Sequence, residues 1–173
     1  IYILAARSAS ALGIFLNYYF SLIFDKVELV TTTSKTEIYE KMFRINEEDV
    51  FIGISFPRYS KQAVSAMNFA KRKGARGIAL TDSLLSPLAQ QADFVLLARS
   101  DMVSVVDSLV APLSVINALV VALCLKCPEQ VRKNLETLEE TWNNYQVYLN
   151  DEIDFIDDEP MLDYSCLLYT SDA

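Results

Sequence analysis

The sequence predicts an α/β domain whose parallel sheet is covered by helices on both faces. Short apolar runs recur along the 173 residues and alternate with longer segments that have helical periodicity. Runs that are apolar throughout are typical of parallel strands, because helices bury both faces of such a sheet. The crossovers between these strands are right-handed. With 52% apolar residues, the chain has enough material for the core of one globular domain.

The expected strands are residues 1–4, 27–30, 50–55, 78–80 and 94–97. The first helix, residues 10–24, has its apolar residues on one face. That face consists of Leu12, Phe15, Leu16, Tyr19 and Ile23. Ser34 and Glu37 have the spacing of a capping box, which predicts a second helix that ends near Phe43.

Three further helices are expected. Residues 61–73 form the third, and Gly74 suits the C′ position at its end. Ser100 or Asp101 is expected to cap a long fourth helix that ends near Lys126. Pro128 allows a fifth helix to begin, because proline is tolerated in a first turn. Its apolar stripe is Val131, Leu135, Leu138, Trp142 and Tyr145.

Polar, hydroxyl-bearing loops follow three of the expected strands. Their side chains are Ser8 and Ser10 after the first strand, Ser55 and Ser60 after the third, and Thr81 and Asp82 after the fourth. In a parallel sheet the loops after the strands share one edge, where ligands bind. The N–H groups and the dipole of a helix N-terminus favour an anion such as phosphate at this edge.

The order and wording of these motifs resemble a SIS (sugar isomerase) domain. Ser-Phe-Pro-Arg-Tyr-Ser-Lys at 55–61 and Ala-Leu-Thr-Asp-Ser-Leu-Leu-Ser-Pro-Leu at 79–88 are similar to the RpiR family of bacterial transcriptional regulators. The resemblance covers residues 1–148. It implies the SIS fold, a three-layer αβα sandwich with a five-stranded parallel sheet in flavodoxin-like order. It also implies a module that senses phosphorylated sugars.

The resemblance implies a ligand site in the loop after the third strand. SIS isomerases carry Ser-x-Ser-Gly-x-Thr there, and this chain has Ser55-Phe-Pro-Arg-Tyr-Ser60. Pro57 and Arg58 replace the second serine and the glycine, which removes a hydroxyl and a backbone donor. Arg58 compensates if it makes a charge-assisted phosphate contact, and Tyr59 is assigned to the same site. The alternative is that Ser60 only caps the helix and Arg58 is solvated.

Two other loops complete the implied ligand site. The family pattern Gly-x-Gly-x-Ser is replaced by residues 5–7, Ala-Ala-Arg, so either Ser8 or Ser10 is the matching serine. Helix capping is the alternative role for both. Thr81 and Asp82 end the fourth strand, and Asp82 accepts hydrogen bonds either from sugar hydroxyls or from N–H groups of its own turn.

Cysteine is sparse, which indicates a reducing compartment, the cytoplasm, rather than a disulfide scaffold. The three cysteines are Cys124, Cys127 and Cys166. Cys124 and Cys127 form a C-x-x-C near a helix C-terminus, whereas redox motifs lie at helix N-termini. No histidine completes a zinc site, so we expect neither a metal nor a cofactor. The apolar run at 109–125 is interpreted as a core or dimer helix rather than a membrane span.

The composition changes after residue 149. We interpret residues 149–173 as an acidic, disordered tail. Residues 165–173 match no family pattern and are similar to translated adapter DNA, so they enter no functional argument. Residues 1–148 are the expected phosphosugar-binding domain. Ile1 begins an expected strand without a methionine, which indicates that the natural N-terminus is missing. The resemblance implies that a DNA-binding helix-turn-helix domain precedes Ile1.

The leading hypothesis is an effector domain that binds a phosphorylated sugar or a related anionic metabolite without turnover. We expect a homodimer or tetramer, no membrane contact, and DNA binding only through the missing domain. The net charge of −8, from 15 basic and 23 acidic residues, disfavours direct DNA contact. A catalytic sugar-phosphate isomerase is the first alternative, with Glu37 or Glu40 as base because the chain has no histidine. A dimerisation domain without ligand is the second.

Overall fold

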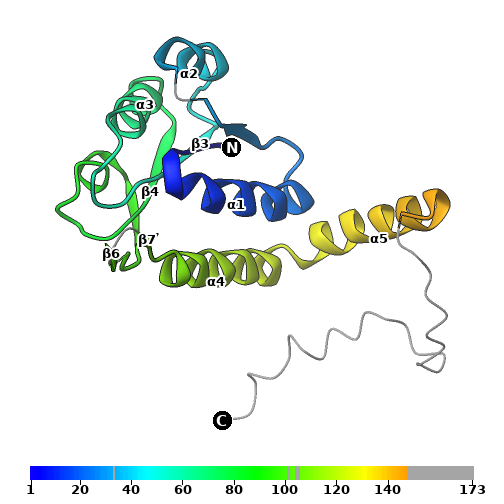
Figure 1. The fold of residues 1–173 in the computed structure, drawn as a ribbon. Coiled ribbons are helices and arrows are strands. Elements are labelled where there is room, and N and C mark those ends of the chain that lie inside the picture. Colours follow the sequence, from blue (N-terminus) through cyan, green and yellow to red (C-terminus); the bar gives the residue numbers. More distant parts are fainter. Residues whose placement is uncertain (33, 101, 104–105, 148–173) are drawn as a thin grey trace. The chain divides into compact units, whose positions relative to one another are not determined.

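The computed structural model describes residues 1–32, 34–100, 102–103 and 106–147 (Figure 1). The chain divides into two compact units, residues 1–122 and 123–173. The first unit contains the whole five-stranded sheet. The predicted tail at 149–173, with Cys166, lies outside the described residues.

The strands and helices follow the predicted order closely. The sheet is formed by β1 (Tyr2–Ala5), β2 (Glu28–Val30), β3 (Val50–Ile54), β4 (Arg76–Thr81) and β5 (Phe94–Leu97). The helices are α1 (Ser10–Ile23), α2 (Lys35–Met42), α3 (Lys61–Arg72), α4 (Val110–Lys126) and α5 (Pro128–Tyr145). The 3-10 turns Arg7–Ala9 and Ala89–Gln91 and the strands β6 (Met102–Val103) and β7 (Val106–Asp107) complete the elements.

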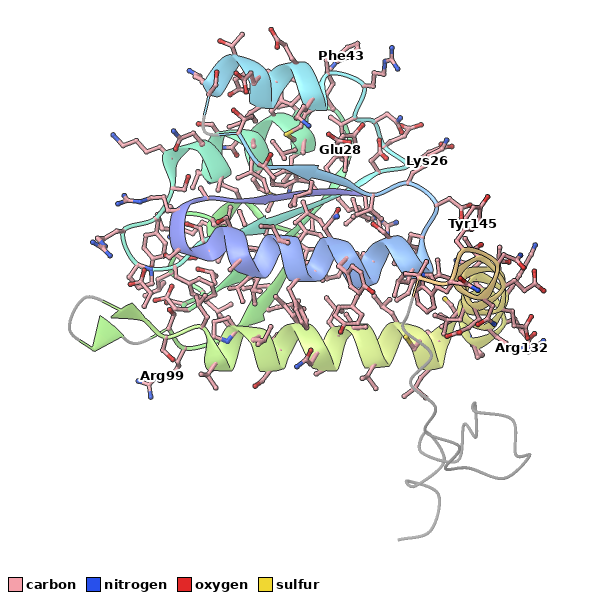
Figure 2. All side chains as sticks on the ribbon, turned by 45° about the vertical axis from the view of Figure 1, so that its right-hand side comes forward. Lys26, Glu28, Phe43, Arg99, Arg132 and Tyr145 are labelled. Atoms are coloured by element: carbon pink, nitrogen blue, oxygen red, sulfur yellow. The ribbon has the colours of Figure 1, made fainter. Side chains whose placement is uncertain are left out.

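The sheet confirms the predicted fold class. All its strands are parallel, and their order is β2-β1-β3-β4-β5, the flavodoxin-like order. Helices α2 and α3 cover one face, and α1 with the first-unit part of α4 covers the other (Figures 1 and 2). The strand order reverses at β1, so β1 and β3 are neighbours although α1, β2 and α2 separate them in sequence.

Burial on both faces explains why the strands are apolar throughout. In β3, Phe51, Ile52 and Ile54 are at most 2% exposed, although successive side chains point to opposite faces. The core beneath α2 and α3 includes Ile38, Met42, Ala63, Ala66, Met67 and Ala70. Small alanines on α3 let that helix lie close to the sheet, and the larger side chains fill the space beside it.

Gly13 sets the distance between α1 and the sheet. A Cβ atom added there would lie 2.9 Å from the Cβ of Ala5 and 3.4 Å from Cδ1 of Leu29. The Cβ of Ala5 has no side-chain torsion through which it can move away. Ala5 is the last residue of β1, so this contact also positions the loop that follows the strand.

The start of the fourth helix was predicted wrongly. It begins at Val110, and the residues before it contribute the antiparallel pair β6 and β7. Pro112 is therefore in the first turn, where proline is tolerated, whereas a start at 101 would have placed it in the helix interior. Ser100 caps no helix, because its hydroxyl donates to the carbonyl of Ser108 at 3.0 Å, and Asp101 lies outside the described residues.

Some of the residues predicted to begin or end helices do so in the structure, and one predicted cap does not form. Ser34 is at the N-cap of α2 but makes no side-chain capping bond, so the predicted capping box does not form. Gly74 follows α3 with φ +90°, the left-handed conformation expected at C′. Pro128 begins α5 as predicted. Within the described residues no single helix is long and apolar enough to cross a membrane, although α4 and α5 reach that length and composition as a bent pair.

We predict that Gly13→Ala lowers the free energy of unfolding by about 1–2 kcal/mol, because overpacking against Ala5 outweighs the higher helix propensity of alanine. Urea denaturation measures the change. Ala11→Gly, at an exposed position of the same helix, is the control and is expected to cost about 1 kcal/mol through propensity alone. A Gly13→Ala variant more stable than the parent would show that α1 does not depend on this close approach.

A candidate anion site at the carboxyl edge of the sheet

A pocket of about 40 Å³ lies beyond the carboxyl ends of β1 and β3. Its lining comes from three segments, namely Ala6, Arg7, Ser8 and Ala9; Ser55, Phe56, Pro57, Arg58 and Ser60; and Ser100, Asp107 and Leu109. The loops after two neighbouring strands therefore meet as the sequence predicted. The third segment, between β5 and α4, was not part of the predicted site.

Ser55 lines this pocket and is held by hydrogen bonds through its backbone and its side chain. It is 4% exposed, and its backbone N–H donates to the carbonyl of Leu80 at 3.1 Å. Its hydroxyl oxygen accepts the N–H of Ser60 at 2.9 Å. A serine hydroxyl that accepts a hydrogen bond keeps its own proton to donate, and an anion is a suitable acceptor for it.

Ser60 both lines the pocket and caps α3. Its hydroxyl oxygen accepts the N–H of Ala63 at 3.3 Å, so the capping role considered in the sequence analysis is realised. The Ser60 side chain also donates to Oε1 of Gln62 at 3.2 Å. Because Ser60 lines the pocket at the N-cap, the positive end of the α3 dipole lies beside the pocket.

Two arginines occupy left-handed backbone positions in the two loops. Arg7 has φ +61° and Arg58 has φ +67°, and both residues line the pocket. Arg58 stands where the resembled pattern has glycine, so the loop keeps a glycine-like backbone with a cationic side chain in place of hydrogen. Each loop thereby brings a guanidinium-bearing residue to a pocket in a chain whose net charge is −8.

Asp107 joins the two loops through its carboxylate. The Ser8 hydroxyl donates to Oδ2 of Asp107 at 2.7 Å, and Nη2 of Arg58 lies 3.6 Å from Oδ1. Each carboxylate oxygen thus has a partner from a different loop. The Asp107 side chain is 22% exposed and that of Arg58 is 61% exposed.

The first loop distinguishes between the two candidate serines. Ser8 lines the pocket, whereas the Ser10 hydroxyl donates to the carbonyl of Arg7 at 2.6 Å and belongs to the turn that precedes α1. Ser10 is not among the residues that line the pocket. Ser8 is therefore the better candidate for the matching serine, because it faces the same space as Ser55.

Tyr59, Thr81 and Asp82 form a separate cluster beside the pocket. The Tyr59 hydroxyl lies 3.0 and 3.2 Å from the two carboxylate oxygens of Asp82, and the Thr81 hydroxyl donates to one of them at 3.2 Å. Burial, and then the hydrogen bond and charge of Asp82, raise the pKa of Tyr59 above its ordinary value. None of the three is among the residues that line the pocket, so their observed contacts tie the loop after β3 to the end of β4.

Sequence reasoning missed Arg7, Ser100 and Asp107 as pocket residues. The signal for Arg7 was present, since it lies between the expected strand and Ser8. Asp107 and Ser100 were missed because a helix was expected from about residue 101. That helix carried Asp107 along its length, away from the sheet edge, and assigned Ser100 to its cap.

The C-x-x-C pair lies at the C-terminal end of α4. Cys124 and Cys127 are both free thiols, and burial raises the pKa of Cys124, which disfavours the reactive thiolate. Cys124 lies near the C-terminus of α4 and Cys127 just after it. In the part of the chain that the structure describes, no group of three or more histidine, cysteine, aspartate or glutamate residues is arranged to hold a metal ion.

This pocket lies in a segment that matches a known family. The SIS domain family model matches residues 1–122, more than half of the chain, and the chain therefore belongs to the SIS domain family. A relative from Caldanaerobacter subterraneus subsp. tengcongensis, an uncharacterized HTH-type transcriptional regulator, is 34% identical over 100 residues. The aligned region is 56% of this chain and 36% of the relative, so the chain spans about a third of that protein's length.

Two solved structures share the fold of this chain. The sugar isomerase domain of an RpiR transcription factor from Sphaerobacter thermophilus has a TM-score of 0.76 and 27% identity, covering 80% of this chain and 77% of that one. Vibrio vulnificus NanR, in complex with ManNAc-6P, has a TM-score of 0.67 and 18% identity, covering 83% and 56%. The second likeness shows the fold alone. The predicted resemblance to SIS domains of RpiR-family regulators is confirmed.

Arg58→Gly and Arg58→Ala are expected to separate backbone strain from charge at the pocket. Both variants lose the guanidinium and with it the contact to Asp107. The glycine variant is expected to have a free energy of unfolding about 1 kcal/mol above that of the alanine variant, because only alanine retains a side chain at φ +67°. Chemical denaturation of the pair tests this, and equal stabilities would contradict the left-handed conformation.

Proposed function

We propose that this chain is the ligand-sensing domain of a transcriptional regulator and that it binds a phosphorylated sugar, or a related anionic metabolite, without turnover. One observation carries the proposal. Ser8, Ser55 and Arg58 come from two different loops and line the same pocket beside the N-terminus of α3. Hydroxyl donors, a guanidinium and a helix N-terminus are the groups that bind phosphate in proteins.

The family relationship supports a phosphorylated sugar as the ligand class. NanR, which shares this fold, was solved with ManNAc-6P. The relative from Caldanaerobacter subterraneus is named as a transcriptional regulator of the HTH type. Because this chain covers only part of that relative, DNA binding is proposed for the whole protein through a helix-turn-helix domain outside the sequence described here.

The lining of the pocket supports binding without turnover. Aldose–ketose isomerisation needs a base that removes a proton from carbon, usually histidine or a carboxylate. The chain has no histidine, and Asp107 is the one carboxylate among the described residues that line the pocket. Its oxygens are engaged by Ser8 and Arg58. Glu37 and Glu40, the bases considered from the sequence, are on α2 and outside that lining.

We further propose that the chain assembles through α4. This helix is apolar over most of its surface, yet only Pro112 and Ile116 are buried. Val110 and Val121 are 73% and 48% exposed, and on α1 Ile14 and Tyr18 are 56% and 54% exposed. Exposed apolar side chains on two helices of one layer form a surface that a second copy can cover. Such a dimer fixes the spacing of two attached DNA-binding domains.

Titration calorimetry with a panel of sugar phosphates, including ManNAc-6P, tests the ligand. We expect at least one to bind, and we expect Ser55→Ala combined with Ser60→Ala to weaken binding by about 1–3 kcal/mol, since Ser55 loses its hydroxyl donor and Ser60→Ala removes the cap of α3 beside the pocket. Ser21→Ala, at an exposed position near the end of α1, is the matched control and leaves the affinity unchanged. Equal affinity in the double variant would place the site elsewhere.

The same ligands test turnover. Protein-dependent exchange of the proton on the carbon next to the sugar carbonyl, followed by NMR in heavy water, is expected to be absent. Exchange above the background rate would support a catalytic isomerase in place of a sensor.

Sedimentation or light scattering of the parent chain at micromolar concentration is expected to give a dimer or a larger assembly. Val121→Asp on α4 is expected to shift the mass toward the monomer, because it places a charge on the proposed interface. Phe43→Asp is the control, since this exposed residue directly follows α2, on the other face of the sheet (Figure 2). A monomeric parent, or equal dissociation by both variants, would exclude α4 as the interface.

A further inference from the structure

We propose that Asp107 is an internal counter-anion that occupies the phosphate position of the pocket and is displaced by the ligand. The inference rests on the proposed function, because it takes the pocket to be an anion site. It adds a residue that determines how strongly, and for which ligands, that site responds.

The partners of Asp107 carry the argument. Its Oδ2 accepts the Ser8 hydroxyl at 2.7 Å, and its Oδ1 lies 3.6 Å from Nη2 of Arg58. These two side chains are also the donors expected to bind phosphate. A hydroxyl has a single proton to donate, so Ser8 cannot donate to the carboxylate and to a phosphate oxygen at once. The two anions therefore compete for the same groups.

The small volume of the pocket favours a ligand that takes the place of the Asp107 carboxylate over one that binds beside it. With the Asp107 carboxylate in place, the pocket encloses about 40 Å³. Sites that enclose small organic ligands typically measure about 300–1,000 Å³. A complete sugar phosphate does not fit within this volume, so it must either extend out of the open side of the pocket or displace a lining side chain. Asp107 also repels a bound phosphate, because both are negatively charged.

Competition of this kind makes the site selective for charge. A phosphate dianion carries more negative charge than the carboxylate, so it gains more from Arg58, Arg7 and the α3 dipole. A neutral sugar offers no charge to Arg58 and cannot replace Asp107 there. Asp107 therefore lowers the affinity for every anion and excludes weakly charged ligands.

Displacement of Asp107 also affects the start of α4, because only two residues separate them. Asp107 ends β7, and α4 begins at Val110. Between them, Leu109 lines the pocket, and the carbonyl of Ser108 accepts the Ser100 hydroxyl at 3.0 Å. A change at Asp107 thus acts on the first turn of the helix that carries the proposed assembly surface.

The test is titration of inorganic phosphate into the full chain and its variants by calorimetry at constant ionic strength. Asp107→Asn keeps the size of the side chain and removes its charge, and Asp107→Ala removes the acceptor as well. Both variants are expected to bind phosphate about tenfold more tightly than the parent, the scale of one lost charge-assisted contact. Glu48→Gln makes the same change in net charge at the opposite edge of the sheet, just before β3, and is expected to have little effect.

A second set of variants tests whether Asp107 and phosphate compete for Ser8 and Arg58. In the background Ser8→Ala with Arg58→Ala, Asp107 has lost both partners for which it competes. Asp107→Asn is then expected to raise phosphate affinity clearly less than it does in the parent, because only the repulsion between the two anions remains. An undiminished effect of Asp107→Asn in this background would show a general field effect and overturn the proposal.

The outcomes also separate this inference from the proposed function. Unchanged or weaker phosphate binding by both Asp107 variants, with binding still weakened by Ser55→Ala combined with Ser60→Ala, would overturn the counter-anion and leave the anion site intact. Weaker binding in that case would make Asp107 a ligand contact. If neither the parent nor the Asp107 variants bind phosphate, the counter-anion and the anion site are both wrong.

Discussion

The adjacency of β1 and β3 is the constraint on which the site depends. These strands are separated in sequence by α1, β2 and α2, yet they pair directly, from Tyr2 with Phe51 to Ala5 with Ile54. The strand order reverses at this point, and loops that leave a reversal point diverge and leave a crevice between them. Ser8 and Ser55 face one pocket because of this pairing, and no local property of either loop would bring them together.

Close packing transmits that constraint to the loops. Gly13 allows α1 to lie against Ala5, and the N–H of Ser55 is held by the carbonyl of Leu80 on the neighbouring strand β4. On the far side of the loop, Tyr59 is hydrogen-bonded to Asp82. The loop after β3 is thus tied at several points. A tied loop can hold Arg58 at φ +67°, because the surrounding bonds offset the cost of that conformation.

The groups around the pocket are mostly positive, whereas the chain as a whole is negative. The protein carries a net charge of −8, but two arginine-bearing loops and a helix N-terminus surround this edge of the sheet. Asp107 compensates part of that positive charge from within the chain. Local geometry, rather than overall composition, therefore decides which ions approach, since exposed charges separated by more than about 10 Å are largely screened at moderate ionic strength.

The sequence by itself determined the sheet, the layers and most of the helix boundaries. Apolar runs and helical periodicity report burial directly, and the motifs at 55–61 and 79–88 carried the family resemblance. The same reasoning placed Ser8, Ser55, Arg58 and Ser60 at one edge, where the structure has them. It failed at α4, where an apolar run without a clear start hid the pair β6 and β7. Only the tertiary structure decided that Ser8 rather than Ser10 lines the pocket, that Tyr59 and Asp82 pair with each other, and that Asp107 joins the two loops. Side-chain partners are chosen by distance in space, and residues 99 positions apart, such as Ser8 and Asp107, leave no local pattern from which their contact can be read.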